Sequence, residues 1–301
     1  MESATGGRPD RALVLSGGGS KGAFQLGALE VLRDNGFTYD CVAGVSVGAL
    51  NGTMVASDRL ERLGQIWRTI KREDVYRGQW PWVLFNVLAG RKGLYDNTPL
   101  LELIRREVDP EAIDIPLEVG VVKLESGNYL PIRPQSSRFE ELVFASTIIP
   151  VIWPPYELGG ESFVDGGLRN ITPLADVIGH NPRRIVIITT EPRDKPPATM
   201  RLSNIIDIAQ RSLDILLDET FQNDIRTFLR INRLVKQAEE AGLTLRDANG
   251  RPYRFYEHLI IEPEEPLGSG LDFDRVRLND WIVQGRAAAE AALEEQGDWP
   301  V

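Results

Sequence analysis

The chain has 301 residues, 42% of them hydrophobic and 26% charged, which is typical of one large globular domain or two small ones. The formal net charge of −10 disfavours binding to nucleic acid, because the phosphate backbone would be repelled. One cysteine, Cys41, excludes an internal disulfide, and two histidines are too few for the usual metal-ligand clusters, so we expect no metal ion and no other cofactor.

The N-terminal residues 1–10 carry charges and no apolar stretch, which predicts an irregular or disordered segment before the first strand. No run in the chain approaches the roughly 18 apolar residues that a membrane-spanning helix requires. We therefore expect a soluble, cytoplasmic protein without a signal peptide, and any contact with membranes is expected to be peripheral.

A strand, a glycine loop and a helix open the predicted domain. Residues 11–16 form a short apolar run typical of a buried parallel strand, and residues 23–36 repeat apolar side chains at helical spacing. The loop between them, GGGSKG at 17–22, can bring its backbone N–H groups close to an anion because glycine has no side chain. It fits an oxyanion hole, a phosphate cradle or an ordinary tight turn. Lys21 is more often a solvated residue in such a loop than a ligand for a lipid phosphate.

The glycine loop only partly fits the common nucleotide-binding patterns. A Walker loop needs Ser or Thr after its lysine, and here Lys21 is followed by Gly22. The glycine spacing does satisfy a dinucleotide-binding fingerprint, but the second strand of the unit leads to a serine turn where a ribose-binding acid is expected. A nucleotide-binding protein is thus an alternative that this loop alone motivates.

The next strand ends in a turn centred on a serine. Residues 41–51, CVAGVSVGALN, predict a strand, a tight turn with Ser46 at its apex and a helix. In a nucleophile elbow the turn is strained and projects the serine hydroxyl, and Gly44 and Gly48 would supply the flanking glycines that the close packing requires. The helix N-terminus would favour an anionic intermediate at the same place. Ordinary tight packing can also produce this pattern.

Residues 67–93 differ in composition from the rest of the chain. Trp80, Trp82 and Phe85 lie in an apolar run that has basic residues on either side. Aromatic side chains flanked by cations are typical of a lid or of a surface that meets lipid head groups. A helix packed into the core is the other interpretation.

The middle of the chain predicts further helices and a hairpin. Thr98-Pro99 opens a helix that continues to about residue 108, because proline is favoured at the first helical position. Residues 117–124 and 128–132 are joined by a short turn and predict a β-hairpin. A helix is expected over 137–148.

An acidic residue follows the next predicted strand, residues 162–164. Asp165 stands at the strand end beside Gly166 and Gly167, where a carboxylate can reach the end of another strand. Asp-Gly is also a common turn. Residues 184–190 then predict another buried strand.

The C-terminal part, residues 200–301, is mainly helical in prediction. From 203 to 241 no glycine or proline interrupts the helical spacing of apolar residues, which predicts one long helix or two with a bend. A strand at 257–263 and a last helix over 273–295 follow. We find no internal repeat and no break in composition, so the sequence predicts a single α/β domain over 11–301, a three-layer sandwich with a mainly parallel central sheet.

Taken together, four blocks within residues 11–190 resemble the patatin-like phospholipases. Each block is a weak signal alone, but four in the family's order are specific. The resemblance implies a parallel-sheet α/β fold, and the C-terminal third has no such match. The blocks are GGGSKG at 17–22, Gly44-Val45-Ser46-Val47-Gly48, Ala145-Ser146 with Pro150, and Asp165-Gly166-Gly167 followed by Asn170 and Pro173.

The resemblance also implies hydrolysis of acyl esters, typically of phospholipids or lysophospholipids, by a Ser-Asp dyad. Ser46 would be the nucleophile and Asp165 the base that takes its proton. A carboxylate is a weak base near neutral pH unless its pKa is raised, so Asp165 needs a partly desolvated site. The assigned glycines are Gly17, Gly18 and Gly19 in the oxyanion hole, where the Val47 N–H is a further candidate, Gly44 and Gly48 in the elbow, and Gly22, Gly166 and Gly167 as supports.

Two other functional hypotheses remain open. Ser46 and Asp165 could belong to a Ser-His-Asp triad with His180 or His258, an order that matches the α/β-hydrolases but leaves the glycine loop unexplained. The chain could also be a lipid-binding module without catalysis, against which the presence of both Ser46 and Asp165 argues. The expected partner is a phospholipid or lysophospholipid, with transient membrane contact through the three aromatic residues of the 67–93 segment.

Overall fold

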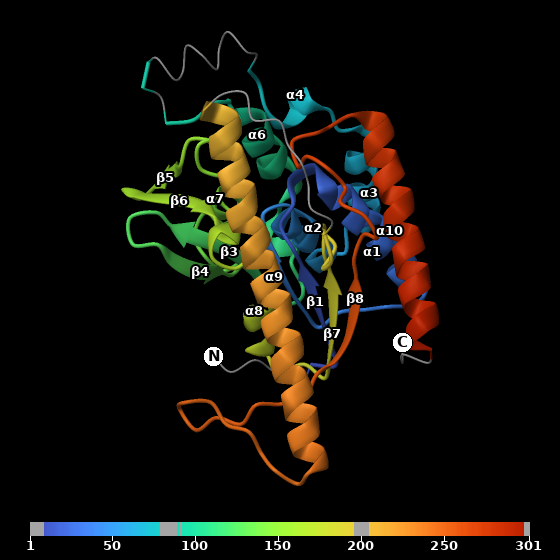
Figure 1. The fold of residues 1–301 in the computed structure, drawn as a ribbon. Coiled ribbons are helices and arrows are strands. Elements are labelled where there is room, and N and C mark those ends of the chain that lie inside the picture. The colour runs from blue at the N-terminus through green and yellow to red at the C-terminus, as the bar shows by residue number, and fades with distance from the viewer. Residues whose placement is uncertain (1–8, 79–88, 91, 196–204, 298–301) are drawn as a thin grey trace.

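The computed structural model, which describes residues 9–78, 89–90, 92–195 and 205–297, is built on an eight-stranded sheet (Figure 1). The strand order is β5-β6-β3-β2-β1-β7-β8, and β4 pairs with β3 outside this path. The strands are β1 (Arg11–Leu15), β2 (Cys41–Val45), β3 (Leu117–Lys123), β4 (Asn128–Ile132), β5 (Tyr156–Leu158), β6 (Glu161–Asp165), β7 (Arg184–Ile188) and β8 (Glu257–Ile261).

Five neighbouring strands, β3, β2, β1, β7 and β8, run parallel. The antiparallel pairs are β3 with β4, β3 with β6, and β5 with β6. Leu15 at the end of β1 is level with Gly44 in β2 and with Ile188 in β7. The loops that follow these strands therefore leave the same edge of the sheet, where ligands bind in open α/β folds. The predicted α/β class with a mainly parallel sheet is confirmed.

Helices cover both faces of this sheet (Figure 1). Side chains alternate along β1, so Leu13 and Leu15 pack with α1 and α10, while Ala12 and Val14 pack with α8 and α9. This arrangement is the predicted three-layer sandwich. The helices are α1 (Gly22–Asp34), α2 (Val47–Ala56), α3 (Leu60–Thr69), α4 (Arg72–Val75), α6 (Thr98–Glu107), α7 (Phe139–Ala145), α8 (Leu174–Ile178), α9 (Ile205–Glu240) and α10 (Arg275–Gln296).

The C-terminal part adds to the same layers. β8 extends the sheet beside β7, and α10 lies along α1 so closely that a Cβ atom on Gly285 would stand 2.0 Å from the carbonyl oxygen of Phe24. The predicted long helix is one continuous element, α9. Among the described residues, no helix is both long enough and apolar enough to cross a membrane.

Some elements differ from the sequence prediction. The helix expected over 137–148 ends at Ala145, because the following N–H groups of Thr147 and Ile148 bond three residues back and close a tight turn. Strand β5 and helices α4 and α8 were not predicted. Each has only three to five residues, too few for a periodic pattern to show.

Candidate active site

Ser46 occupies a strained turn between β2 and α2, with φ 56° and ψ −127°. A Cβ atom on Gly44 would lie 2.2 Å from the carbonyl oxygen of Gly48, and one on Gly48 would lie 2.2 Å from that of Leu15. Only glycine fits at these two positions, so the turn has the strand, apex and helix that an elbow requires. The serine is nevertheless buried, with 6% of its surface exposed.

The backbone of Ser46 is held by a residue one hundred positions away. Its N–H donates to the Ser146 hydroxyl over 2.9 Å, and that hydroxyl donates to the carbonyl oxygen of Gly120 over 2.7 Å. Ser146 is fully buried. Ser146 lies in one of the four blocks that resemble the family, but no local pattern in the sequence links it to the serine turn, so no role was predicted for it.

Asp165 ends β6 and is buried beside the serine turn, with 3% of its surface exposed. Burial raises the pKa of this carboxyl to about 7, while hydrogen bonds from the Gly167 N–H and the Ser46 side chain act in the opposite direction. The Gly167 bond spans 2.8 Å. The structure thus brings the predicted nucleophile and base together, in the desolvated setting that a carboxylate base needs.

The glycine loop lies against the same serine. An added Cβ atom on Gly17 would be 3.2 Å from the Cβ of Ser46. The Gly17 N–H is already donated to the carbonyl oxygen of Ile171 over 3.1 Å, whereas the N–H groups of Gly18 and Gly19 have no hydrogen-bond acceptor among the described residues. Of the three predicted donors, Gly18 and Gly19 are therefore the ones free to bind a substrate oxygen.

Two residues that the sequence analysis missed hold this loop in place. The Thr190 hydroxyl donates to the carbonyl oxygen of Gly17 over 2.5 Å, and the Ser20 N–H donates to the carbonyl oxygen of Gly270 over 2.8 Å. Thr190 follows β7, the strand that pairs in parallel with β1. Had the strand order been predicted, it would have placed Thr190 at the same carboxyl edge of the sheet as the glycine loop. Gly270 lies in a loop with no such signal.

Lys21 is not the solvated loop residue that we expected. Its side chain is buried and forms an ion pair with Glu191, which also pairs with Lys195 at 3.0 Å. The glycine loop is thereby tied to the segment that follows β7. A buried cation needs such a partner, which explains why Lys21 points inward rather than into solvent.

Both histidines lie away from the serine turn. His180 bonds Glu118 through Nε2 at 3.0 Å, and His258 bonds the Asn232 amide at 3.2 Å. His258 lies in β8, opposite Ile185 near the start of β7, whereas Ser46 follows the end of β2, three strands from β8 in the sheet. Neither histidine shares a hydrogen bond with Ser46 or Asp165 in the described chain.

The sequence model of the family described as patatin-like phospholipase matches residues 13–178, which is more than half of the chain and spans both Ser46 and Asp165. The chain belongs to the patatin-like phospholipase family. The predicted resemblance is confirmed.

Relatives within this family include an uncharacterized NTE family protein of Mycobacterium tuberculosis, 26% identical over 193 residues that cover 63% of this chain and 51% of that protein. The chain thus spans about half the length of the mycobacterial relatives. Lysophospholipase NTE1 of Cryptococcus neoformans var. neoformans is 28% identical over 207 residues, 60% of this chain and 12% of that protein.

Among solved structures, VipD from Legionella pneumophila aligns with a TM-score of 0.47 and 14% identity, over 97% of this chain and 68% of that one. The human GIVD cytosolic phospholipase A2 aligns with a TM-score of 0.35 and 12% identity, over 96% of this chain and 60% of that one.

The aromatic segment is described only at its two ends in this patatin-like chain. Trp80, Trp82 and Phe85 lie outside the described residues. Trp67 is buried and its indole N–H donates to Asn51 over 2.9 Å, and Tyr76 is buried against Trp153 with ring centroids 5.3 Å apart. Both of these residues, which lie in the N-terminal part of the segment, belong to the core.

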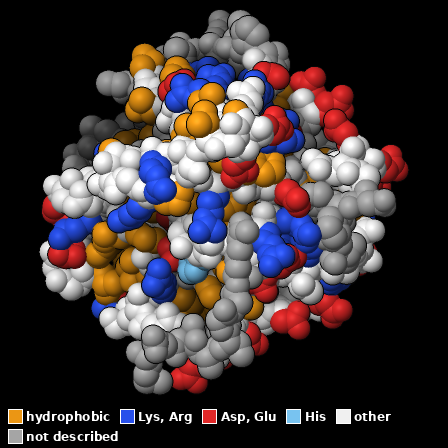
Figure 2. All heavy atoms as spheres, turned by 90° about the horizontal axis from the view of Figure 1, so that it is seen from below, with side chains coloured by type: hydrophobic (Ala, Val, Ile, Leu, Met, Phe, Trp, Pro, Cys, Tyr) orange, Lys and Arg blue, Asp and Glu red, His pale blue; other side chains and the backbone are white. Residues whose placement is uncertain are grey.

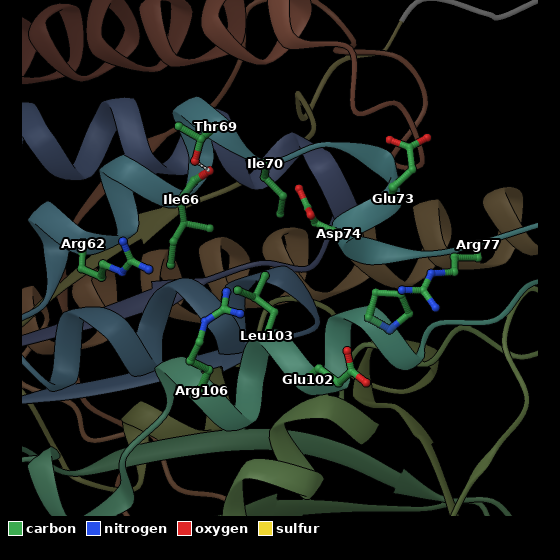
Figure 3. Close-up of a pocket in the computed structure, with 11 residues that line it drawn as sticks. Arg62, Ile66, Thr69, Ile70, Glu73, Asp74, Arg77, Glu102, Leu103 and Arg106 are labelled. Atoms are coloured by element: carbon green, nitrogen blue, oxygen red, sulfur yellow. Dashed lines mark hydrogen bonds between the residues drawn. The ribbon is translucent and has the colours of Figure 1, made fainter.

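Other surfaces of the molecule stand apart from the patatin-like site. A hollow of about 270 Å³ lies between α3, α4 and α6 and is lined by charges of both signs and by none of the predicted site residues. Figure 3 shows the residues that line it. Figure 2 shows the face of the molecule seen from below the view of Figure 1, with Lys and Arg side chains among hydrophobic ones. The described residues hold no group of three or more His, Cys, Asp or Glu side chains that could bind a metal ion.

Proposed function

We propose that the protein hydrolyses ester-linked acyl chains of phospholipids or lysophospholipids with a Ser46-Asp165 dyad. The observation that carries the proposal is the carboxyl of Asp165, which is buried beside the serine turn, is influenced by the Ser46 side chain and has a pKa raised to about 7 by its burial. A group with that pKa can accept a proton near neutral pH and return it. Membership of the patatin-like phospholipase family supports a lipid as the substrate.

Acylation begins when Asp165 accepts the Ser46 hydroxyl proton as Oγ attacks the ester carbonyl. The developing oxyanion is stabilised by the free N–H groups of Gly18 and Gly19, with the N-terminus of α2 directed at the same place. The intermediate then expels the alcohol, which takes the proton from Asp165. In deacylation Asp165 removes a proton from water, which attacks the acyl-serine carbonyl. As the tetrahedral intermediate collapses, Asp165 returns this proton to the departing Ser46 Oγ, and the fatty acid is released.

The test of the proposal is incubation of the purified protein with a mixed lipid extract, followed by mass spectrometry of the fatty acids and lysolipids released. The negative control is the Ser46→Ala variant, incubated with the same extract under the same conditions. Release by the wild type alone supports hydrolysis. Lipid that binds to the protein without release of fatty acid would favour the non-catalytic lipid-binding module instead.

The pKa of Asp165 predicts that the rate of ester hydrolysis rises with pH. The base form is lost as pH falls through about 7, so kcat/KM for a soluble short-chain ester should reach a plateau above this value and fall about tenfold per pH unit below it. The measurement is a pH-rate profile of the wild type between pH 5 and 8.5. A flat profile over that range would show that Asp165 is not the base.

The histidines separate the dyad from a Ser-His-Asp triad. His180→Gln and His258→Gln, singly and together, should keep turnover of the soluble ester within about tenfold of the wild type, because both side chains bond groups away from Ser46. In a triad, loss of the imidazole base lowers turnover by about a thousandfold or more. Such a loss in a variant with the wild-type melting temperature would replace the dyad with a triad.

A further inference from the structure

One short segment bonds the backbones of both proposed catalytic residues. The Ser146 hydroxyl accepts the N–H of Ser46 at 2.9 Å, and two residues later the carbonyl oxygen of Ile148 accepts the N–H of Asp165 at 2.8 Å. Ser46 follows β2 and Asp165 ends β6, with β3 between these strands in the sheet. Residues 146–148 therefore bridge two strands that do not pair with each other.

The bridging segment is rigid. The N–H of Ser146 bonds the carbonyl oxygen of Leu142 at 2.9 Å, and that of Ile148 bonds Ala145 at 3.1 Å, so the segment continues α7 as a closed turn. Ser146 and Ala145 are fully buried, and Ile148 is 1% exposed. This burial and these bonds restrict the movement of the segment.

At the serine turn the hydroxyl of Ser146 acts as a hydrogen-bond acceptor. A hydroxyl has a single proton, and that of Ser146 is donated to the carbonyl oxygen of Gly120. Its oxygen is then an acceptor directed at the Ser46 N–H. Because this hydroxyl has no solvent access and its proton is bonded to a carbonyl rather than to a base, Ser146 is not placed to act as a nucleophile.

We propose that Ser146 is a positioning residue that holds Ser46 in its strained turn and, through the 146–148 segment, sets its distance from Asp165. The proposal rests on the proposed function, since it concerns the same site. Ser46 has a positive φ that a residue with a side chain rarely adopts, so the turn persists only where its surroundings hold it. Without the Ser146 oxygen, the buried Ser46 N–H loses its acceptor and the turn can relax.

The test compares Ser146→Ala with a matched variant, Thr147→Val. The neighbouring hydroxyl of Thr147 is also buried, but it bonds only the carbonyl oxygen of Phe144 within α7, at 2.7 Å. Both variants remove one hydroxyl from the same turn, and only Ser146→Ala removes the acceptor of the Ser46 N–H. The readouts are kcat and KM on a soluble short-chain ester, the rate at which a small fluorophosphonate labels Ser46, the pH-rate midpoint and the melting temperature.

For Ser146→Ala we expect kcat and the labelling rate to fall about tenfold to a hundredfold, because a displacement of about 1 Å at a reacting group costs that much. KM should stay within about threefold, since the substrate contacts are unchanged. The pH midpoint should move above the wild-type value, because the Ser46 side chain lowers the pKa of Asp165 and does so less when Ser46 is displaced. Thr147→Val should keep both rates within about twofold of the wild type.

The proposal is overturned if Ser146→Ala labels and turns over like the wild type, or if both variants lose rate equally and in step with melting temperature. Should Ser146→Ala not fold, Ser146→Cys takes its place with the same expectation, because sulfur fills the space but is a poor hydrogen-bond acceptor. If the wild type itself is not labelled at Ser46, the proposed function fails and this inference fails with it. If only the Ser146 effect is missing, the proposed function stands.

Discussion

Ser46→Ala is expected to reduce hydrolysis of a soluble ester by at least about a thousandfold and to end labelling by a fluorophosphonate, because Ser46 is the proposed nucleophile that forms the acyl-enzyme. The change removes one oxygen beside Asp165 and leaves the Ser46 backbone and its bond to Ser146 in place. The fold should persist. The measurements are kcat, the site of labelling by mass spectrometry and the melting temperature.

Ser57→Ala is the matched control for this change. Ser57 lies at the end of α2, the helix that Ser46 precedes, and its hydroxyl bonds the carbonyl oxygen of Thr53 at 2.8 Å. We expect this variant to keep turnover within about twofold of the wild type. Labelling of a different serine in the Ser46→Ala protein, or turnover within about tenfold of the wild type, would contradict the assignment of the nucleophile.

Asp165→Asn should also abolish turnover, by about a thousandfold or more, because an amide cannot accept the proton of the Ser46 hydroxyl. The amide oxygen can still accept the Gly167 N–H, so the shape of the loop is retained. The measurement is kcat on the soluble ester across the pH range of the wild-type profile. Turnover that follows the wild-type pH profile in this variant would mean that another residue is the base.

Asp176→Asn is the matched control for the carboxyl-to-amide change. Burial raises the pKa of Asp176 to about 6, and this carboxylate accepts the hydroxyl of Tyr129 at 2.6 Å rather than that of Ser46. Asp176→Asn therefore makes the same carboxyl-to-amide change at a buried residue outside the proposed dyad. We expect its loss to change turnover by no more than about tenfold, with any decrease following stability.

Asp165→Asn also has a predicted effect on stability. The pKa of Asp165 is about 7 in the folded protein and near 3.8 in the unfolded chain. Between these values the folded state holds a proton that the unfolded state has lost, so the carboxyl's contribution to the free energy of unfolding is fully present below about pH 4 and is lost as pH rises through about 7. Asparagine does not titrate. The melting temperature of the variant relative to the wild type should therefore rise between pH 4 and 8.

Local sequence was sufficient for the first strand-loop-helix unit and for the serine turn. The glycine loop, Ser46 and its two flanking glycines all lie within a short stretch, where apolar periodicity and the need for glycine at close backbone contacts are visible in the residues themselves. Parallel pairing of β1 with β2 then follows from the helix between them. The family blocks added Asp165, which local patterns alone could not distinguish from an aspartyl turn.

Residues far apart in the chain complete the candidate site, and local sequence patterns did not predict their contacts. The Ser46 N–H donates to Ser146, and the charge of Lys21 is paired with Glu191. The glycine loop is held by hydrogen bonds to Thr190 and Gly270. Such bonds leave no periodic pattern, because they arise only when the strand order brings distant loops to one edge of the sheet. The same holds for the raised pKa of Asp165, since desolvation is a property of everything packed around the carboxyl and not of the residues beside it in the chain.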